Sequence, residues 1–121
     1  IKLKLKIKNT LKVKRITDKN AIWKNIKAQI DASGERILKK DILKTEAFNI
    51  VLVYLGKTQE IPPHPEDYGV FFFILEGSGI FTKKDGEHSL QKGDTLYYEK
   101  NELRGIRSNK KLILLGIQES P

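Results

Sequence analysis

Hydrophobic and polar residues alternate strictly at the start of the chain. From Ile1 to Lys8, isoleucine or leucine occupies each odd position and lysine each even one, and Leu11 and Val13 continue the odd phase. A period of two over this length predicts a β-strand with one apolar and one basic face. As an edge strand, it would use its lysines against aggregation and pack its apolar face on a sheet, including that of a homodimer partner. The alternative is a basic ribbon for nucleic acid or another anionic surface, although no aromatic residue is interleaved to stack on bases.

One segment has the spacing of a helix. Between residues 18 and 32 the apolar residues recur at helical intervals, Asn20 can cap the segment, and Ser33-Gly34 can end it. The sequence therefore predicts one short N-terminal helix, in which Trp23 is a packing anchor rather than a ligand-stacking residue. We expect residues 35–121 to form the main domain. Residues 1–34 are expected to form an arm that packs on this domain or on a dimer partner.

From residue 35 onward the chain has the pattern of strands joined by short turns. Turn signals recur at roughly 8–12-residue spacing, which with a single early helix predicts an all-β sandwich or barrel. The glycine-rich residues 76–79 are expected to turn the chain back, and Asp85-Gly86 to form the turn of a hairpin. The expected strands are Ile37–Lys44, Phe48–Leu55, Val70–Leu75 and residues 95–99, 104–108 and 112–118, together with the hairpin at 81–88.

The composition fits one soluble globular domain. The chain has 121 residues, of which 39% are hydrophobic and 31% charged. No apolar run approaches the ~20 residues of a membrane helix, so no membrane partner is expected. The absence of cysteine excludes disulfides, thiolate zinc sites and cysteine nucleophiles, and by elimination we expect a cytoplasmic location.

The net charge of +8 is concentrated near the N-terminus. Residues 1–27 contain nine lysines and Arg15 against one acidic residue, Asp18, so the rest of the chain is close to neutral. Nucleic-acid binding would require a basic surface on the folded domain or on this segment. Because the rest of the chain is close to neutral, we do not expect a nucleic-acid partner. Nucleic-acid binding through the basic N-terminus remains the second alternative function.

Candidate chemistry begins in the segment before the Val70–Leu75 run. Three prolines at positions 62, 63 and 65 hold the chain extended. His64 and Glu66 are two residues apart, so on an extended backbone they project from the same face. The sequence thus predicts an imidazole and a carboxylate side by side at the mouth of a buried sheet.

Residues 60–79 and 93–108 resemble the two motifs of the cupin family, G-x5-H-x-H-x3-4-E-x6-G and G-x5-P-x-G-x2-H-x3-N. The resemblance implies a double-stranded β-helix, or jelly-roll barrel, whose motifs supply three histidines and one glutamate to a metal. The turn glycines and the hydrophobic alternation match. The first motif falls on His64, Glu66, Val70 and Gly77, and the second on Gly93, Glu99, Asn101, Arg104 and Ser108.

Most of the family's metal ligands are replaced in this chain. His64 is retained, and Glu66 stands where the second histidine would be and could still bind a cation. Val70 replaces the glutamate and has no donor, and Arg104 replaces the last histidine with a permanent positive charge. Since a catalytic metal normally has three protein ligands, we expect no metal cofactor. The alternative is a divalent transition metal held by His64 and Glu66 and completed by water or another residue.

What replaces the metal can be inferred from the family's strand alternation, which turns Phe72 and its apolar neighbours inward with a polar cluster of His64, Glu66, Tyr98 and Arg104. Glu66 and Arg104 could form an internal ion pair. Arg104 could instead bind the carboxylate or phosphate of a small molecule, with His64 and Tyr98 as further contacts and Phe72 on the pocket wall. A third interpretation is a polar plug that only stabilises the barrel.

These observations favour a metal-free small-molecule-binding, regulatory or structural module without an obvious catalytic centre. The alternative is a metal-dependent enzyme of the dioxygenase or sugar isomerase or epimerase type that uses His64 and Glu66. An epimerase would need a general base near neutral pH, and His64 alone would have to serve. Whether the protein is an enzyme is left open, with the balance against it.

Overall fold

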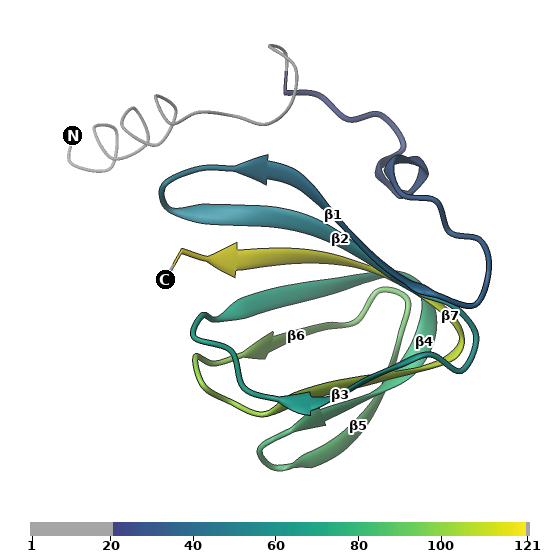
Figure 1. The fold of residues 1–121 in the computed structure, drawn as a ribbon, viewed down its shortest axis with the longest axis vertical. Helices are drawn as coiled ribbons and strands as arrows, with labels where there is room; N and C mark the ends of the chain where they lie inside the picture. The colour runs from purple at the N-terminus through teal and green to yellow at the C-terminus, as the bar shows by residue number, and fades with distance from the viewer. Residues whose placement is uncertain (1–20, 121) are drawn as a thin grey trace.

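The computed structural model describes residues 21–120, and within them the chain is a β-barrel with almost no helix (Figure 1). The predicted all-β fold is confirmed, whereas the strand expected over residues 1–13 lies outside the described residues. In chain order the elements are the 3-10 turn η1 (Ile26–Gln29) and the strands β1 (Ile37–Lys44), β2 (Phe48–Leu55), β3 (Glu60–His64), β4 (Val70–Lys83), β5 (Gly86–Gln91), β6 (Thr95–Tyr98) and β7 (Arg104–Glu119).

Two long antiparallel strands, β4 and β7, run through both layers of the barrel (Figure 1). They pair from Val70 with Gln118 to Thr82 with Gly105. In one layer the order is β1-β2-β7-β4-β6, and in the other it is β3-β7-β4-β5. The first half of β4 therefore carries side chains that face those of the first half of β7 across the interior.

The sequence predicted that the glycine-rich residues 76–79 turn the chain back, and this prediction is wrong. β4 continues through them, with register shifts between Ile74 and Glu76 and between Gly77 and Gly79. Gly77 has φ +86, and a Cβ there would lie 1.7 Å from the carbonyl oxygen of Lys111. Glycine is needed because β4 approaches β7 this closely where the strand changes layer.

The hairpin at residues 81–88 forms, but its turn differs from the prediction by one residue. Lys83 pairs with Gly86, so Lys84 and Asp85 are the turn residues. Gly86 has φ +124, whereas Asp85 has no positive φ. The positive φ that the hairpin requires is therefore supplied by the residue after the turn, as in hairpins with a glycine bulge.

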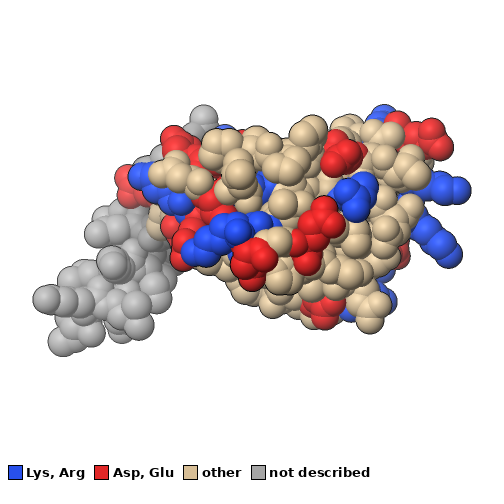
Figure 2. Space-filling model, turned by 90° about the horizontal axis from the view of Figure 1, so that it is seen from below, with Lys and Arg blue, Asp and Glu red and all other residues tan. Residues whose placement is uncertain are grey.

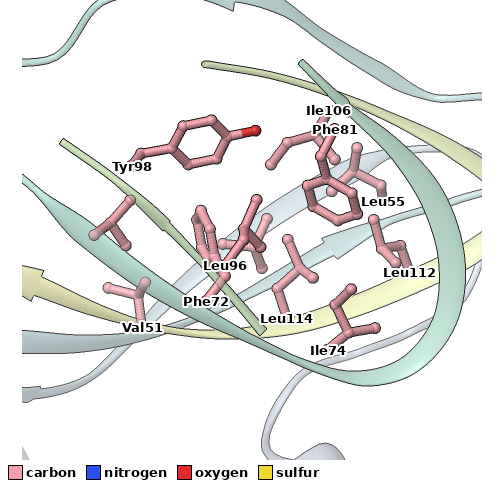
Figure 3. Close-up of a cluster of buried hydrophobic side chains, with 12 residues drawn as sticks. Val51, Leu55, Phe72, Ile74, Phe81, Leu96, Tyr98, Ile106, Leu112 and Leu114 are labelled. Carbon is pink, nitrogen blue, oxygen red and sulfur yellow. The ribbon is translucent and has the colours of Figure 1, made fainter. Parts of the chain in front are cut away.

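The main core lies between the two layers (Figure 3). Strand alternation explains it, because Val51, Val53 and Leu55 of β2 point inward while the residues between them point outward. Phe72, Tyr98 and Arg104, which the family's strand alternation turned inward, are all buried. The cluster contains Val51, Val53, Leu55, Val70, Phe72, Ile74, Phe81, Leu96, Tyr98, Ile106, Leu112 and Leu114.

A second apolar cluster lies on the outer face of β1, β2 and β7, under the segment that precedes β1. Trp23 and Ile26 pack there against buried residues that include Ile30 and Ile113. The Tyr54 hydroxyl donates to the carbonyl of Gly34 at 2.7 Å and fixes the end of the segment. Trp23 is thus a packing residue, as expected.

The helix predicted over residues 18–32 is wrong for the part that is described. Only Ile26–Gln29 are helical, in a single 3-10 turn. Asn25 before it has φ 51 and ψ 70, in the left-handed region, and Ile30 after it is extended, so the turn cannot propagate in either direction. Packing of the apolar side chains on the sheet overrides their helical spacing. No helix within residues 21–120 is long and apolar enough to span a membrane.

Candidate functional site

A cavity of about 250 Å³ lies inside the barrel. Its polar lining comes from both layers and from the connection between β3 and β4, and its walls are mainly aliphatic and aromatic. Phe72, which the sequence placed on the pocket wall, does line it, as do His64, Glu66 and Arg104. The full lining is Ile37, Lys39, Val53, Ile61, His64, Glu66, Tyr68, Val70, Phe72, Arg104, Ile106 and Gln118.

His64 and Glu66 lie side by side at the mouth of the cavity, as their spacing predicted. His64 Nε2 is 3.0 Å from Glu66 Oε2, and His64 Nδ1 is 2.9 Å from the carbonyl oxygen of Pro62. A carbonyl can only accept, so Nδ1 carries the proton and donates to it. The side chains are 40% and 36% exposed, so solvent screens the pair and it contributes little to stability.

Arg104 begins β7 directly opposite His64, the last residue of β3. Although it is charged, only 5% of Arg104 is exposed. Its Nη2 donates to the carbonyl oxygens of Tyr68 at 2.8 Å and Glu99 at 2.9 Å. The buried Nε and Nη1 have no hydrogen-bond acceptor on the protein. Arg104 therefore lines the cavity as a charged residue, and two of its buried nitrogens have no partner on the protein.

The ion pair between Glu66 and Arg104, one of the alternatives left open by the sequence, is not formed. The carboxylate of Glu66 contacts His64 instead, and no acidic side chain within residues 21–120 lies within 4.0 Å of the Arg104 nitrogens. His64 is opposite Arg104 in the strand register, whereas Glu66 follows the end of β3. The buried positive charge consequently has no counter-charge within hydrogen-bonding distance.

Two tyrosine rings hold the guanidinium of Arg104. Its Cζ lies 5.2 Å from the centroid of the Tyr68 ring and 5.3 Å from that of Tyr98. Tyr68 lines the cavity, although it was not among the residues that the sequence assigned to the pocket. Burial, followed by the nearby Glu66 carboxylate, raises the pKa of Tyr68, so its phenol stays neutral.

Tyr98 does not line the cavity, although the sequence placed its hydroxyl there. The side chain is fully buried, its ring meets that of Phe72 edge to face, and its hydroxyl donates to the carbonyl of Gly105 at 3.3 Å. Burial, with the charge of Glu102 as the next contribution, raises the pKa of Tyr98 far above its ordinary value. Tyr98 is a neutral support for Arg104 rather than a cavity contact.

Glu102 positions the connection that carries one of the Arg104 acceptors. It is buried, and its carboxylate accepts from the backbone N–H groups of Glu99 at 2.8 Å and Lys84 at 3.1 Å and from Lys83 Nζ at 3.2 Å. Burial acts to raise the pKa of Glu102, but these hydrogen bonds and Lys83 outweigh it, and the pKa is lowered. Nothing in the sequence distinguishes Glu102 from a surface glutamate.

Lys39 and Gln118 also line the cavity and were not anticipated. Gln118 could have been found by extending the inward alternation of Leu112 and Leu114 along β7, and its Nε2 donates to the Tyr68 hydroxyl at 3.4 Å. Lys39 is exposed on β1. It faces the cavity because β1 lies at the end of the layer, and nothing in the sequence distinguishes it from the adjacent Lys40.

The residues at the family's metal-ligand positions do not fit a divalent cation. Val70 has no donor, Arg104 brings a permanent positive charge, and the Nε2 of His64 is already engaged by Glu66. In the part of the chain that is described, no three histidine, cysteine, aspartate or glutamate side chains come together in a way that could hold a metal ion. The donors that remain at the mouth of the cavity are His64 and Glu66 alone.

Comparison with known proteins identifies the fold. The family model described as cupin domain matches residues 51–116. A conserved protein of unknown function from Streptococcus pyogenes superposes with a TM-score of 0.76 at 16% identity, covering 90% of this chain and 94% of its own. An RmlC-like cupin from Desulfovibrio desulfuricans gives 0.72 at 21% identity, covering 83% and 97%.

A cupin superfamily protein from Desulfitobacterium hafniense gives a TM-score of 0.76 at 15% identity, covering 91% of this chain and 99% of its own. No curated protein sequence matches the chain. These identities support the shared fold and nothing finer. The family model, in contrast, matches more than half of the chain. Its span includes all of β3 to β6 and most of the cavity lining. The chain belongs to the cupin domain family.

Proposed function

We propose that this protein is a binding module that holds a small molecule inside the barrel without a metal. The observation that carries the proposal is the buried Arg104, a cavity-lining residue whose Nε and Nη1 have no acceptor on the protein. Buried polar groups in folded proteins are almost always hydrogen-bonded. A ligand in the cavity would supply the acceptors that the chain itself does not.

The lining of the cavity has the composition of a ligand site. Such sites are mainly apolar with a few convergent polar groups that fix the orientation of the ligand. Here Val70, Phe72 and Ile106 provide apolar walls, and Arg104 and His64 provide polar contacts on adjacent strands. An interior that served only as a polar plug would satisfy its own donors, which Arg104 does not.

A metal-dependent enzyme is less well supported by the same residues. It would need a third donor beside His64 and Glu66, and the position nearest to them in the register carries the Arg104 guanidinium. A metal-free isomerase would need a general base, and both nitrogens of His64 are already engaged by Pro62 and Glu66. Binding requires neither a third donor nor a free base.

Nucleic-acid binding by the barrel is also poorly supported. Acidic and basic side chains are interspersed on the face shown in Figure 2, and no broad basic surface covers it. Residues 21–120 contain nearly equal numbers of basic and acidic residues. A duplex or single strand would need a basic surface that tracks the phosphates.

A cavity-blocking variant tests the proposal. Ile61 lines the cavity and is half-buried, so Ile61→Trp would fill part of the cavity while the new side chain could still reach solvent. Lys57→Trp, on the exposed turn after β2, is the matched control. We expect a panel of small organic acids, amides, alcohols and sugars to contain ligands that raise the melting temperature of the native protein and the control but not of Ile61→Trp.

The same experiment includes a test of metal independence. Binding measured by calorimetry should be unchanged by a chelator, and elemental analysis of the purified protein should show no stoichiometric transition metal. Stoichiometric iron, manganese, nickel or zinc would overturn the proposal in favour of the metal-dependent alternative. Binding that survives Ile61→Trp would place the ligand outside the barrel.

A further inference from the structure

The charges around the cavity indicate what kind of molecule it takes. We infer that the ligand is a small monocarboxylate with an apolar body, with its carboxylate on Arg104 and its body against Val70, Phe72 and Ile106. This inference rests on the proposed binding function and adds the chemical class of the ligand. It depends on three observations: the charge that is left uncompensated, the donors that are free, and the size and polarity of the walls.

The first observation is an excess of one buried positive charge. Arg104 is permanently charged and 5% exposed, and no carboxylate within residues 21–120 pairs with it. Glu66, the acidic residue of the lining, contacts His64 at the mouth of the cavity and is 36% exposed, so solvent screens its charge. A buried unpaired charge is costly, and a single negative charge on the ligand removes that cost. A phosphate, with a charge of about −1.5 to −2, would leave an excess negative charge among apolar walls.

Lys39 does not change this balance of charges around Arg104. Its side chain lines the cavity from β1 but is exposed, so water screens its charge. The rings of Tyr68 and Tyr98 attract the guanidinium but carry no negative charge that would neutralise it. Burial and the Glu66 carboxylate raise the pKa of Tyr68, so its phenol stays neutral. The ligand therefore meets one strong cationic group.

The second observation is that the free donors of Arg104 suit a carboxylate. Nη2 is used by the carbonyls of Tyr68 and Glu99, which leaves the N–H groups of Nε and Nη1. A carboxylate has two oxygens and several lone pairs, so it can accept from donors that point in different directions. Charge-assisted hydrogen bonds of this kind are roughly twice as strong as neutral ones, so an amide of the same shape would bind more weakly.

The third observation is the size and polarity of the cavity. At about 250 Å³ it lies below the roughly 300–1,000 Å³ of sites that take drug-sized ligands. Its walls are aliphatic or aromatic at Val53, Ile61, Val70, Phe72 and Ile106. A branched-chain or benzoate-sized acid can fill this space and remove apolar surface from water, whereas acetate has the charged group without the body.

Matched pairs of acid and amide test the inference on the native protein, so no variant of Arg104 is needed. The probes are benzoate with benzamide, 3-methylbutanoate with 3-methylbutanamide, acetate, and inorganic phosphate, each titrated by calorimetry or by NMR shifts. We expect at least one of the two larger acids to bind at least tenfold more tightly than its amide. Acetate and phosphate should bind more weakly than that acid.

The outcomes separate this inference from the proposed function. If amides bind as tightly as acids, if phosphate binds at least as tightly as both acids, or if neutral members of the wider panel bind while neither acid does, the monocarboxylate class is wrong and the binding function stands. If no probe and no panel member binds in a manner sensitive to Ile61→Trp, both fail. Loss of acid binding in Ile61→Trp, with retention in Lys57→Trp, would place the acid inside the barrel.

Discussion

Two buried charged residues, Glu102 and Arg104, are satisfied to opposite extents although one residue separates them. The Glu102 carboxylate accepts from two backbone N–H groups and one lysine, so its negative charge is fully solvated by the protein. Arg104 keeps two nitrogens without acceptors. Glu102 is therefore explained by the fold alone, whereas Arg104 is explained only when something else occupies the cavity.

We predict that Glu102→Gln destabilises the protein at neutral pH by about 1.5–3 kcal/mol, because hydrogen bonds to a charged acceptor are lost. The folded pKa of Glu102 lies below the ordinary value of 4.5, so its contribution is complete above that pH and disappears as the pH falls through the lower folded pKa. Urea denaturation of both proteins across pH 3–7 should show the difference narrowing at the acid end.

Glu99→Gln is the control for this measurement. Glu99 is 61% exposed and pairs with the equally exposed Lys84, so its removal should change stability little at any pH. A Glu102→Gln protein whose stability loss is as small as that of Glu99→Gln, or does not depend on pH, would contradict the assignment of Glu102 as the residue that holds this connection.

At the scale of elements, the first two strands were predictable, whereas the unbroken length of β4 and β7 and the shortness of the helix were not. Ile37–Lys44 and Phe48–Leu55 are found with the bounds that their patterns indicate, because β-strand pairing and burial both follow the period of two. The segment before β1 has helical spacing, but Asn25 is left-handed and the apolar residues pack on a sheet that already exists. Tertiary packing of this kind cannot be deduced from local spacing.

The candidate site was predictable in part for the same reason. His64 and Glu66 follow from their spacing on one extended segment. The partners of Arg104 do not, because they are main-chain carbonyls of Tyr68 and Glu99, and any residue type could supply them. Tyr98 was placed on the correct face of its strand, but its depth within the barrel depends on the curvature of both layers.

We predict that Gly77→Ala destabilises the protein much more than Gly93→Ala. The two glycines have similar positive φ values, +86 and +93, so the intrinsic strain of alanine is comparable, about 1–2 kcal/mol. At Gly77 the new Cβ would also meet the carbonyl oxygen of Lys111 at 1.7 Å, whereas at Gly93 no atom lies within 4 Å. The difference should exceed about 2 kcal/mol in chemical denaturation.

Equal losses for the two variants would show that the approach of β4 to β7 at residue 77 is not required for the barrel. The comparison is informative because both variants carry the same chemical change. It isolates the close strand contact from the backbone preference of glycine, which the two positions share.

At the scale of the whole molecule, one part of the outer surface is unusually apolar. Phe71, Phe73, Tyr97 and Ile117, here called the aromatic patch, are each 40–41% exposed and lie on neighbouring strands β6, β4 and β7. The same layer is covered over β1, β2 and the adjoining part of β7 by the segment before β1. Exposed apolar patches on a folded protein commonly mark interaction surfaces.

We propose that a second copy of the chain covers the aromatic patch and forms a homodimer. The sequence predicted dimerisation through the N-terminal strand instead, and that strand lies outside the described residues. Glu119, bonded to the Tyr97 hydroxyl, lies at one end, and Lys27 and Lys111, which share Glu76, lie toward the other. A two-fold arrangement brings these opposite charges together, as an isologous interface requires. The patch therefore complements itself in both polarity and charge.

Light scattering coupled to size exclusion tests this proposal. The native protein should elute as a dimer at micromolar concentration, and Phe71→Glu combined with Phe73→Glu should give a folded monomer, because four buried carboxylates would face each other in the dimer. Leu103→Glu, at a residue that is 51% exposed outside the patch, should remain dimeric. A monomeric native protein would contradict the proposal.

The two hydrogen bonds of Arg104 Nη2 have a consequence for how binding would be sensed. They join the connection between β3 and β4 to the connection between β6 and β7 through one side chain that also faces the cavity. Under the proposed function, the binding free energy of a ligand that immobilises this guanidinium would stabilise the ordered conformation of both connections. The concentration of a metabolite would then set the rigidity of the barrel's rim, so that the same arginine serves as receptor and as transmitter.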